Sequence, residues 1–281
     1  MSIARLMQQA AARVGGTVPP FPETTSYGPV YGNWDGSYIN VNVTAPPSTT
    51  SNNFSGIDSS YDAVNNRLYD AYAGNNSYAY FPGLVPTGAA NNLPNKPVGS
   101  GRGSTVAYQN GSSYVLMSNA SNNKIDVWKI GAGGAYTYKG GMFGSSPNGG
   151  IAFAQYDSNS YFFTTTNGSR LIYRHPLPDL ESLSSQSIAN DREYIVTANL
   201  GFNLSFIGED GNGDLYFAFK HFASTAGVNI NKISKTAPNG AYFTGRAISS
   251  GVVGYNLWVD YSTPRIYAGG LSSSLASFWT V

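Results

Sequence analysis

Carboxylates are the main groups in this sequence that could carry acid–base chemistry. The chain has 281 residues with fifteen acids, two histidines and no cysteine, which excludes thiolate nucleophiles and Cys-based zinc sites. Two carboxylates about 5–10 Å apart can cleave a glycosidic bond, one as proton donor and the other as nucleophile or base. Among the fifteen acids, only Asp58 lies early in the first strand of a predicted repeat. A hydrolase would therefore depend on Asp58.

Four other acids recur at one position of the predicted repeats. Asp62, Asp157, Asp210 and Asp260 each follow a predicted first strand, where a tight hairpin turn belongs. A catalytic set is not expected to repeat in this way, whereas turn-forming residues are. We therefore predict that the chain is not an enzyme and has no catalytic residues.

The segment GEDGNGDLYFAF, residues 208–219, carries oxygen ligands at alternate positions. Asp210, Asn212 and Asp214 resemble the start of a calcium loop, but no bidentate Glu follows at the required spacing. A glycine-rich hairpin that leads into a strand explains the same residues. We predict no metal and no cofactor, and these three residues are the weaker, calcium-binding alternative.

Neither the histidines nor the glycine runs indicate a catalytic or phosphate-binding site. His175 and His221 lie at predicted strand exits, and we predict structural or surface roles for both. The sequence has no G-x-S-x-G elbow, and its glycine runs precede no predicted helix.

Aromatic residues are abundant, with 21 Tyr, 14 Phe and 4 Trp. Most must pack in the core, but tyrosine beside Asn, Ser and Gly is also typical of binding surfaces. Trp34, Tyr78, Trp258 and Tyr261 lie near predicted loops or strand ends and are our candidate ligand contacts, with core packing as the alternative.

A repeat of strand, turn, strand, turn and strand positions these residues. The start of the second strand recurs at spacings of 46, 47, 54 and 51 residues. The five anchor positions are Leu68, Tyr114, Tyr161, Leu215 and Ile266. A period of about 40–50 residues with three or four short strands per unit is typical of β-propeller blades.

The repeat predicts an all-β fold, a five-bladed β-propeller. Fourth strands fit at 135–139, 194–199 and 241–247, and the fifth repeat ends after three strands. The segment SYINVNVT, residues 37–44, would supply the outermost strand of the last blade and so close the ring. A β-sandwich with coincidental spacing is the alternative.

Composition argues against several partners. Sixteen basic and fifteen acidic residues give a formal net charge of +1, and the basic residues form no stripe, so we predict no nucleic acid and no polybasic contact with a membrane. No stretch approaches the roughly 20 apolar residues that span a bilayer. The N-terminus is not a typical secretory signal, because Gln8 and Gln9 interrupt its apolar region.

The first residues, MSIARLMQQAAARV, predict a short amphipathic helix. Large apolar residues recur at helical spacing on one face, and Gly15 and Gly16 end the helix before a proline-rich tether. Burying that face roughly offsets the entropy of ordering about 12 residues, so one copy would dock weakly. Stable attachment would need a preformed pocket or several tethered copies.

The stretch MSIARLMQQAAA resembles a short leader at the start of structural proteins of marine tailed bacteriophages, including cyanophages. The resemblance covers about twelve residues and implies a virion protein whose leader attaches to a phage capsid or tail protein while the remaining domain faces outward. Here Arg13 and Val14 precede the glycines, whereas the leader of those proteins tends to continue directly into glycine. The candidate anchoring residues are Ile3, Arg5, Leu6, Met7, Ala10 and Val14.

These observations predict an anchoring helix at 1–16, a tether at 17–35 and a propeller at 36–281. We predict a virion appendage protein on the external surface of the particle, made in the host cytoplasm and present in several copies. Its propeller would bind a host-surface glycan or another receptor. The alternatives are a decoration or adaptor protein without a host ligand, and a polysaccharide-degrading glycosidase of the virion.

Overall fold

The computed structural model describes 41–42, 58–72, 77–84, 91–94, 101–144, 149–166, 168–196, 203–209, 214–220, 228–234, 241–248, 256–260, 265–269 and 275–277. Within these residues the chain is all-β, as predicted, and its one helical turn is the 3-10 turn η1 (Ala132–Gly134). The predicted helix at 1–16 and tether at 17–35 lie outside the described residues.

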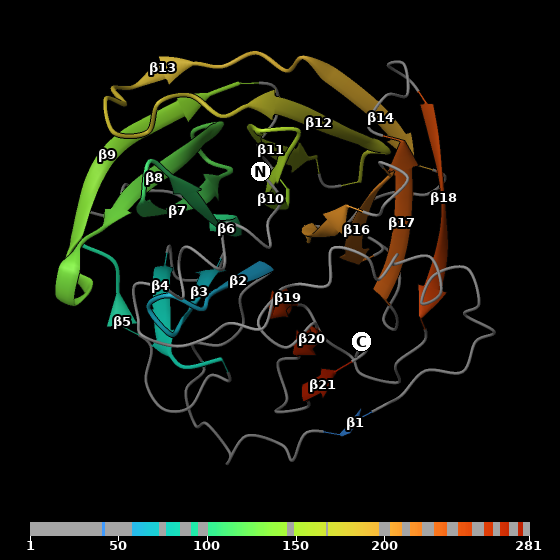
Figure 1. The fold of residues 1–281 in the computed structure, drawn as a ribbon, viewed down its shortest axis with the longest axis horizontal. Helices are drawn as coiled ribbons and strands as arrows, with labels where there is room; N and C mark the ends of the chain where they lie inside the picture. Colours follow the sequence, from blue (N-terminus) through green and yellow to red (C-terminus); the bar gives the residue numbers. More distant parts are fainter. Residues whose placement is uncertain are drawn as a thin grey trace.

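The strands form four sheets arranged around a common centre (Figure 1). The first repeat gives one antiparallel sheet. Its strands are β2 (Asp58–Asp62), β3 (Arg67–Tyr72), β4 (Ser77–Pro82) and β5 (Asn91–Asn92). The second repeat gives a sheet that receives a fifth strand from a later segment. Its strands are β6 (Gly101–Gln109), β7 (Ser112–Asn119), β8 (Lys124–Ile130), β9 (Tyr136–Phe143) and β13 (Gln186–Ser187).

The third and fourth repeats share one eight-stranded sheet, because their outer strands β14 and β18 pair in parallel. The third repeat contributes β10 (Ile151–Tyr156), β11 (Asn159–Thr165), β12 (Leu171–Pro176) and β14 (Arg192–Val196). The fourth contributes β15 (Ser205–Glu209), β16 (Asp214–Lys220), β17 (Val228–Ser234) and β18 (Ala241–Ile248).

The last sheet joins both ends of the described chain. It contains β19 (Asn256–Asp260), β20 (Arg265–Gly269), β21 (Leu275–Ser277) and β1 (Val41–Asn42). Strand β1 pairs antiparallel with β21, with Val41 opposite Ser277. Part of the segment predicted to supply this outer strand, residues 37–44, thus lies where expected.

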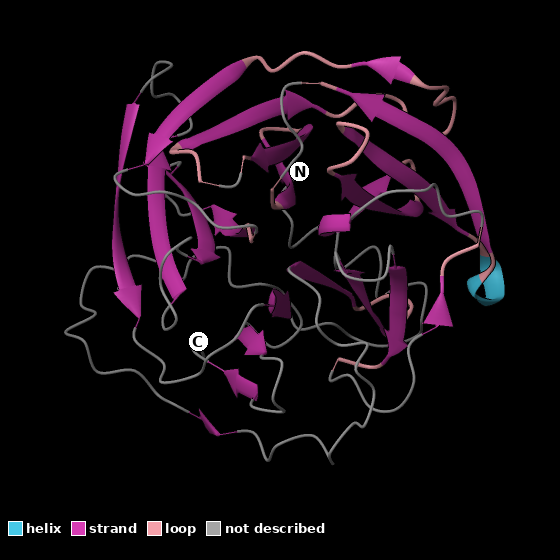
Figure 2. Ribbon diagram, turned by 180° about the vertical axis from the view of Figure 1, so that it is seen from behind, coloured by secondary structure: helices cyan, strands magenta, loops and turns pink. Residues whose placement is uncertain are grey.

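The arrangement is propeller-like. The first strands of the repeats contact one another in cyclic order: β2 with β6, β6 with β10, β10 with β15, β15 with β19, and β19 with β2. Figure 1 shows β2, β6, β10 and β19 near the centre, with later strands of the repeats farther out, and Figure 2 shows the same ring of strands from behind. We call β2, β6, β10, β15 and β19 the innermost strands.

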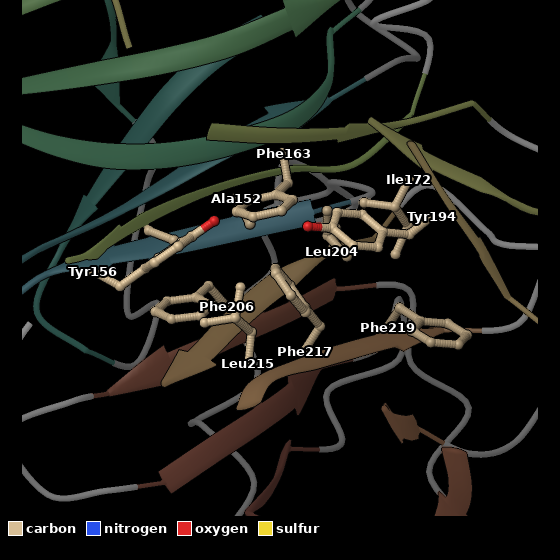
Figure 3. Packing of buried hydrophobic residues seen from close by; sticks show 11 residues of the cluster. Ala152, Tyr156, Phe163, Ile172, Tyr194, Leu204, Phe206, Leu215, Phe217 and Phe219 are labelled. Carbon is tan, nitrogen blue, oxygen red and sulfur yellow. The ribbon is translucent and has the colours of Figure 1, made fainter. Parts of the chain in front are cut away.

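The hydrophobic core lies between neighbouring repeats. Figure 3 shows the cluster between the third and fourth, where the rings of Phe163 and Phe217 meet edge to face with centroids 4.7 Å apart. A second cluster joins the second and third repeats through Leu116 and Phe162. A third joins the first and second through Tyr69 and Trp128. Burial of one sheet face against the next therefore holds the strands around the centre.

Glycines allow the innermost strands to begin close together. A Cβ atom on Gly150 would lie 2.4 Å from the backbone nitrogen of Leu204, directly before β15. A Cβ atom on Gly103, in β6, would lie 2.8 Å from the carbonyl oxygen of Gly149. Both neighbours are backbone atoms, which cannot turn aside as a flexible side chain could.

His175 belongs to the core of the third repeat. Its side chain is 1% exposed, its ring stacks on Phe162 with centroids 4.7 Å apart, and its Nε2 lies 3.0 Å from the Thr164 hydroxyl. Burial lowers the pKa of His175 to about 4. This placement agrees with the structural role predicted for it.

The glycine contact predicts the cost of one added methyl group. Gly150→Ala should lower the free energy of unfolding by about 1–3 kcal/mol, because β10 or β15 must shift. Gly131→Ala is the matched control, since a Cβ there meets its nearest atom at 3.4 Å and its φ is −89°. Urea unfolding monitored by tryptophan fluorescence measures the free energy of unfolding of both variants. Equal stability of the two variants would contradict this account of the centre.

The burial of His175 predicts a loss of stability in mild acid. A lowered pKa means that the folded state binds fewer protons than the unfolded state between pH 6.5 and about 4. The stability that the neutral ring contributes is complete above pH 6.5 and is lost as pH falls, by up to about 3 kcal/mol. Urea unfolding of the parent and of His175→Gln across this range should show that the difference between their free energies of unfolding becomes smaller as the pH falls. A constant difference would be the contradicting result.

Candidate functional site

A small cavity lies where the innermost strands meet. It has a volume of about 50 Å³ and is lined by all five of these strands together with Leu204. Its apolar lining includes Ile151, Phe153 and Val259. Its hydroxyl-bearing lining residues are Ser59, Ser60, Tyr61, Ser104, Thr105, Tyr108 and Ser205. No carboxylate is among the lining residues of this cavity.

The cavity is too small for a sugar ring. A cavity of about 50 Å³ holds only a few water molecules. Sites for small organic ligands are typically about 300–1,000 Å³. A saccharide would therefore have to bind at one of the two ends of the cavity.

Hydrogen bonds between β2 and β6 define these two ends. The Ser60 and Ser104 hydroxyl oxygens lie 3.2 Å apart, and farther along both strands the Tyr108 hydroxyl donates to Asp62 Oδ1 at 3.0 Å. The two strands thus run in the same direction. We call the end at which they begin the strand-start end, and the end with Tyr61, Tyr108 and Asp62 the tyrosine end.

The strand-start end carries the acid singled out from the sequence. Asp58 is the first residue of β2, directly before the cavity-lining Ser59 and Ser60. On the neighbouring strand, Arg102 lies at the same end beside an irregularity in the β6–β7 register. The Arg102 side chain is half-buried, and this burial lowers its pKa. A carboxylate position and a guanidinium therefore lie on adjacent innermost strands.

Ser59 connects this end to a second acid. Its hydroxyl donates to Asp70 Oδ1 on β3 at 3.1 Å, and the Asp70 side chain is fully buried. The buried Ser104 hydroxyl donates to the backbone oxygen of Tyr69 at 3.2 Å. These bonds hold the hydroxyl groups of the lining in fixed positions.

The tyrosine end is built on the β2–β3 turn. Asp62 is fully buried and accepts hydrogen bonds from the Asn65 amide group at 2.6 Å and from the backbone nitrogen of Val64 at 3.0 Å. Burial raises the pKa of Asp62, while the bonds from Asn65, Tyr108 and Val64 oppose that rise. Asp62 thus acts in the turn, as its position in the repeats predicted.

The structure places the predicted ligand contacts in different settings. Trp258 lies on β19 with its side chain 0% exposed, so it packs in the core; this burial contradicts the predicted ligand contact. Its place near a strand end does not reveal that the neighbouring sheets cover it. Tyr78 lies on β4 opposite Ala71. Trp34 and Tyr261 lie outside the described residues.

The remaining predicted sites lie largely beyond the described part of the chain. The anchoring positions Ile3, Arg5, Leu6, Met7, Ala10 and Val14 are all outside it. So are the calcium candidates Asp210 and Asn212 and the histidine His221, while Asp214 opens β16.

Within the described residues, no cluster of three or more His, Cys, Asp or Glu side chains could hold a metal ion. No helix in that part of the chain is long and apolar enough to cross a membrane.

Sequence reasoning missed the tyrosine end. Tyr61 and Tyr108 lie between more polar or smaller neighbours in their strands, as core residues also do, so nothing in the sequence distinguishes them from core tyrosines. The recurring turn acid Asp62 was the available signal, because its carboxylate holds Tyr108.

No protein-family model and no curated protein matches the chain. Solved structures do match it. One is an exo-β-1,3-galactanase variant from Phanerochaete chrysosporium with β-1,3-galactotriose, at 14% identity and a TM-score of 0.57 over 86% of this chain and 64% of the galactanase. The same enzyme with galactose matches at 13% identity and a TM-score of 0.57 over 86% and 64%. The chain thus spans about 64% of the galactanase, and at this identity the likeness shows the fold alone.

This similarity corrects one prediction. The recurrence of turn acids led to the expectation that the chain is not an enzyme. The galactanase structures contradict it, because a fold of this kind carries glycosidase activity in a known protein. The turn acids were interpreted correctly at Asp62, but they say nothing about acids at the opposite ends of the innermost strands.

Proposed function

We propose that the chain is a polysaccharide-degrading glycoside hydrolase built on a five-bladed propeller. The observation that carries the proposal is a carboxylate residue, Asp58, at the start of an innermost strand in a fold similar to that of exo-β-1,3-galactanase. The substrate class is a neutral polysaccharide of linked pyranoses. A β-1,3-linked galactan is the first polymer to test.

The strand order supports five blades. Each sequence repeat would be one blade, and the eight-stranded sheet would be two blades joined through β14 and β18. The cyclic contacts of the innermost strands support a ring of five. The β1–β21 pair would close that ring within the last blade.

The strand-start end offers groups suited to this chemistry. A carboxylate at Asp58 would serve as nucleophile, as base or as proton donor, and cleavage of the glycosidic bond would require a second carboxylate within about 5–10 Å of it. The Arg102 guanidinium would hold substrate hydroxyl oxygens by donating hydrogen bonds. Since the cavity below is narrow, the polymer would lie across this end rather than thread through it.

We place this hydrolase on the outside of a bacteriophage particle. The leader MSIARLMQQAAA supports this by its resemblance to leaders of phage structural proteins. The leader would attach to a capsid or tail protein in several copies, and the propeller would meet the host-surface glycan that it cleaves. An enzyme that cleaves such a glycan first binds it, so host recognition and hydrolysis would share one site.

The proposal predicts that Asp58→Asn abolishes hydrolysis. The variant should release reducing sugar from a susceptible polysaccharide at least about 100-fold more slowly than the parent, because one of two required carboxylates is lost. The assay uses a panel of β-1,3-galactan and other neutral polysaccharides, with products resolved by mass spectrometry. Asp58→Gly with added azide then tests the role, since azide restores turnover where a nucleophile or base was removed.

Asp157→Asn is the matched control. Asp157 is an exposed acid in the β10–β11 turn with φ +48°, a conformation that Asn tolerates well. It should hydrolyse the polymer at the parental rate. Absence of hydrolysis by the parent across the panel, or full activity of Asp58→Asn, would overturn the proposed function.

The virion location predicts the effect of removing the leader. A chain lacking residues 1–18 should fold and hydrolyse polysaccharide like the parent, because the innermost strands begin far along the chain at Asp58. It should fail to enter phage particles, which immunoblotting of purified particles measures. Particles that contain the truncated chain at the parental level would rule out anchoring through the leader.

A further inference from the structure

The tyrosine end has features of a binding site that the hydrolytic reaction does not use. Asp58 and Asp62 are the first and last residues of β2. At about 3.3 Å per residue, the two ends of the strand lie about 13 Å apart. Groups at the tyrosine end are thus outside hydrogen-bonding reach of a bond being cleaved near Asp58.

Two tyrosines at this end are held by a single turn. The Tyr61 hydroxyl donates to Asn66 Oδ1 at 2.8 Å, and the Tyr108 hydroxyl donates to Asp62 Oδ1 at 3.0 Å. Asp62 and Asn66 are the two ends of the turn between β2 and β3. The rings come from adjacent innermost strands, β2 and β6, and both line the cavity.

The turn itself is rigid. The Asp62 carboxylate accepts hydrogen bonds from the backbone nitrogen of Val64 and the side-chain amide of Asn65. The backbone nitrogen of Gly83 donates to the backbone oxygen of Asn66 at 2.8 Å. Asn66 has φ +51°, a conformation that Asn tolerates better than most residues. The tyrosines therefore keep their orientation before any ligand arrives, which lowers the entropy cost of binding.

The chemistry of this end suits a neutral sugar. Both tyrosines are half-buried, so each combines apolar ring surface with exposure to solvent. A pyranose presents C–H groups that pack on aromatic rings such as those of Tyr61 and Tyr108. Asp62 is fully buried, so its charge is not offered to a ligand.

We propose that Tyr61 and Tyr108 form a second, non-catalytic binding site for a neutral pyranose at the tyrosine end. The choice of a sugar as the ligand rests on the proposed function. The site would keep the enzyme on its polymer between cleavage events, because two linked sites on one chain raise the effective concentration of substrate.

The experiment uses the full chain in the Asp58→Asn background, so that substrate is bound without turnover. β-1,3-Galactotriose and a panel of neutral oligosaccharides are titrated by calorimetry, and hydrogen exchange locates the protected amides. We expect protection at 61–66 and 105–109 in addition to the start of β2. Tyr61→Ala and Tyr108→Ala should each weaken binding at this end about tenfold and remove that protection.

Tyr138→Ala is the matched control. Tyr138 is also half-buried and also donates to a buried aspartate, Asp126 Oδ1, at 2.8 Å, but it is not among the residues that line the cavity. It should bind the sugars with parental affinity. Thermal unfolding verifies that each variant folds. If Tyr108→Ala fails to fold, Tyr61→Ala still decides the test, because the hydrogen-bond partner that it loses, Asn66, is exposed to solvent.

The outcomes separate this inference from the proposed function. Parental affinity and protection in both tyrosine variants would overturn the second site while leaving hydrolysis intact. Failure of every oligosaccharide to protect 61–66 and 105–109 would also overturn it. Absence of hydrolysis by the parent chain would instead contradict the proposed function, whatever binds at the tyrosines.

Discussion

The close approach of the innermost strands at the centre is the constraint on which the structure depends. Neighbouring backbones meet where Gly103, Gly149 and Gly150 carry no side chain. Because the centre is this tight, the space left between the strands holds only a few water molecules. Any larger ligand must bind at an end of the cavity, and the residues at the two ends of each innermost strand therefore decide what the protein can recognise.

The outer edges of two sheets are covered by strands from another part of the chain. Each sheet ends in a strand whose outward groups would be open to pairing with another chain. The segment after β12 covers two such edges: β13 pairs with β9 of the second repeat, and β14 pairs with β18 of the fourth. Along the way Leu180 and Leu183 are buried, and Glu181 binds Lys129 Nζ at 2.6 Å. The segment from β13 to β14 thus ties three consecutive repeats together.

Much of this fold could be predicted from the sequence, because the repeat has a local cause. Hairpin turns need particular residues, so Asp62 and the positive-φ residue Asp157 mark the ends of innermost strands. All five anchor positions lie in the second strand of their repeat. The cross-repeat pairs of β13 and β14 could not be predicted, since they join segments distant in sequence without any local signal.

The burial and the contacts of individual side chains were harder to predict from the sequence than the strands. Trp258 stands close to a strand end, yet the packing of neighbouring sheets buries it completely. Tyr108 was not distinguished in sequence, because its role comes from a bond to an aspartate 46 residues earlier. The same limit affected the prediction of function. Four of the fifteen acids recur in predicted turns, and this recurrence was given more weight than the single acid Asp58 at the start of a strand.

The central claim is that a polysaccharide is cleaved at the strand-start end of a propeller. It is tested most directly by a crystal structure of the Asp58→Asn variant with β-1,3-galactotriose or another oligosaccharide that the parent cleaves. The account predicts that the scissile bond lies against residue 58, with Arg102 beside the sugar. A scissile bond located away from residue 58 would contradict it.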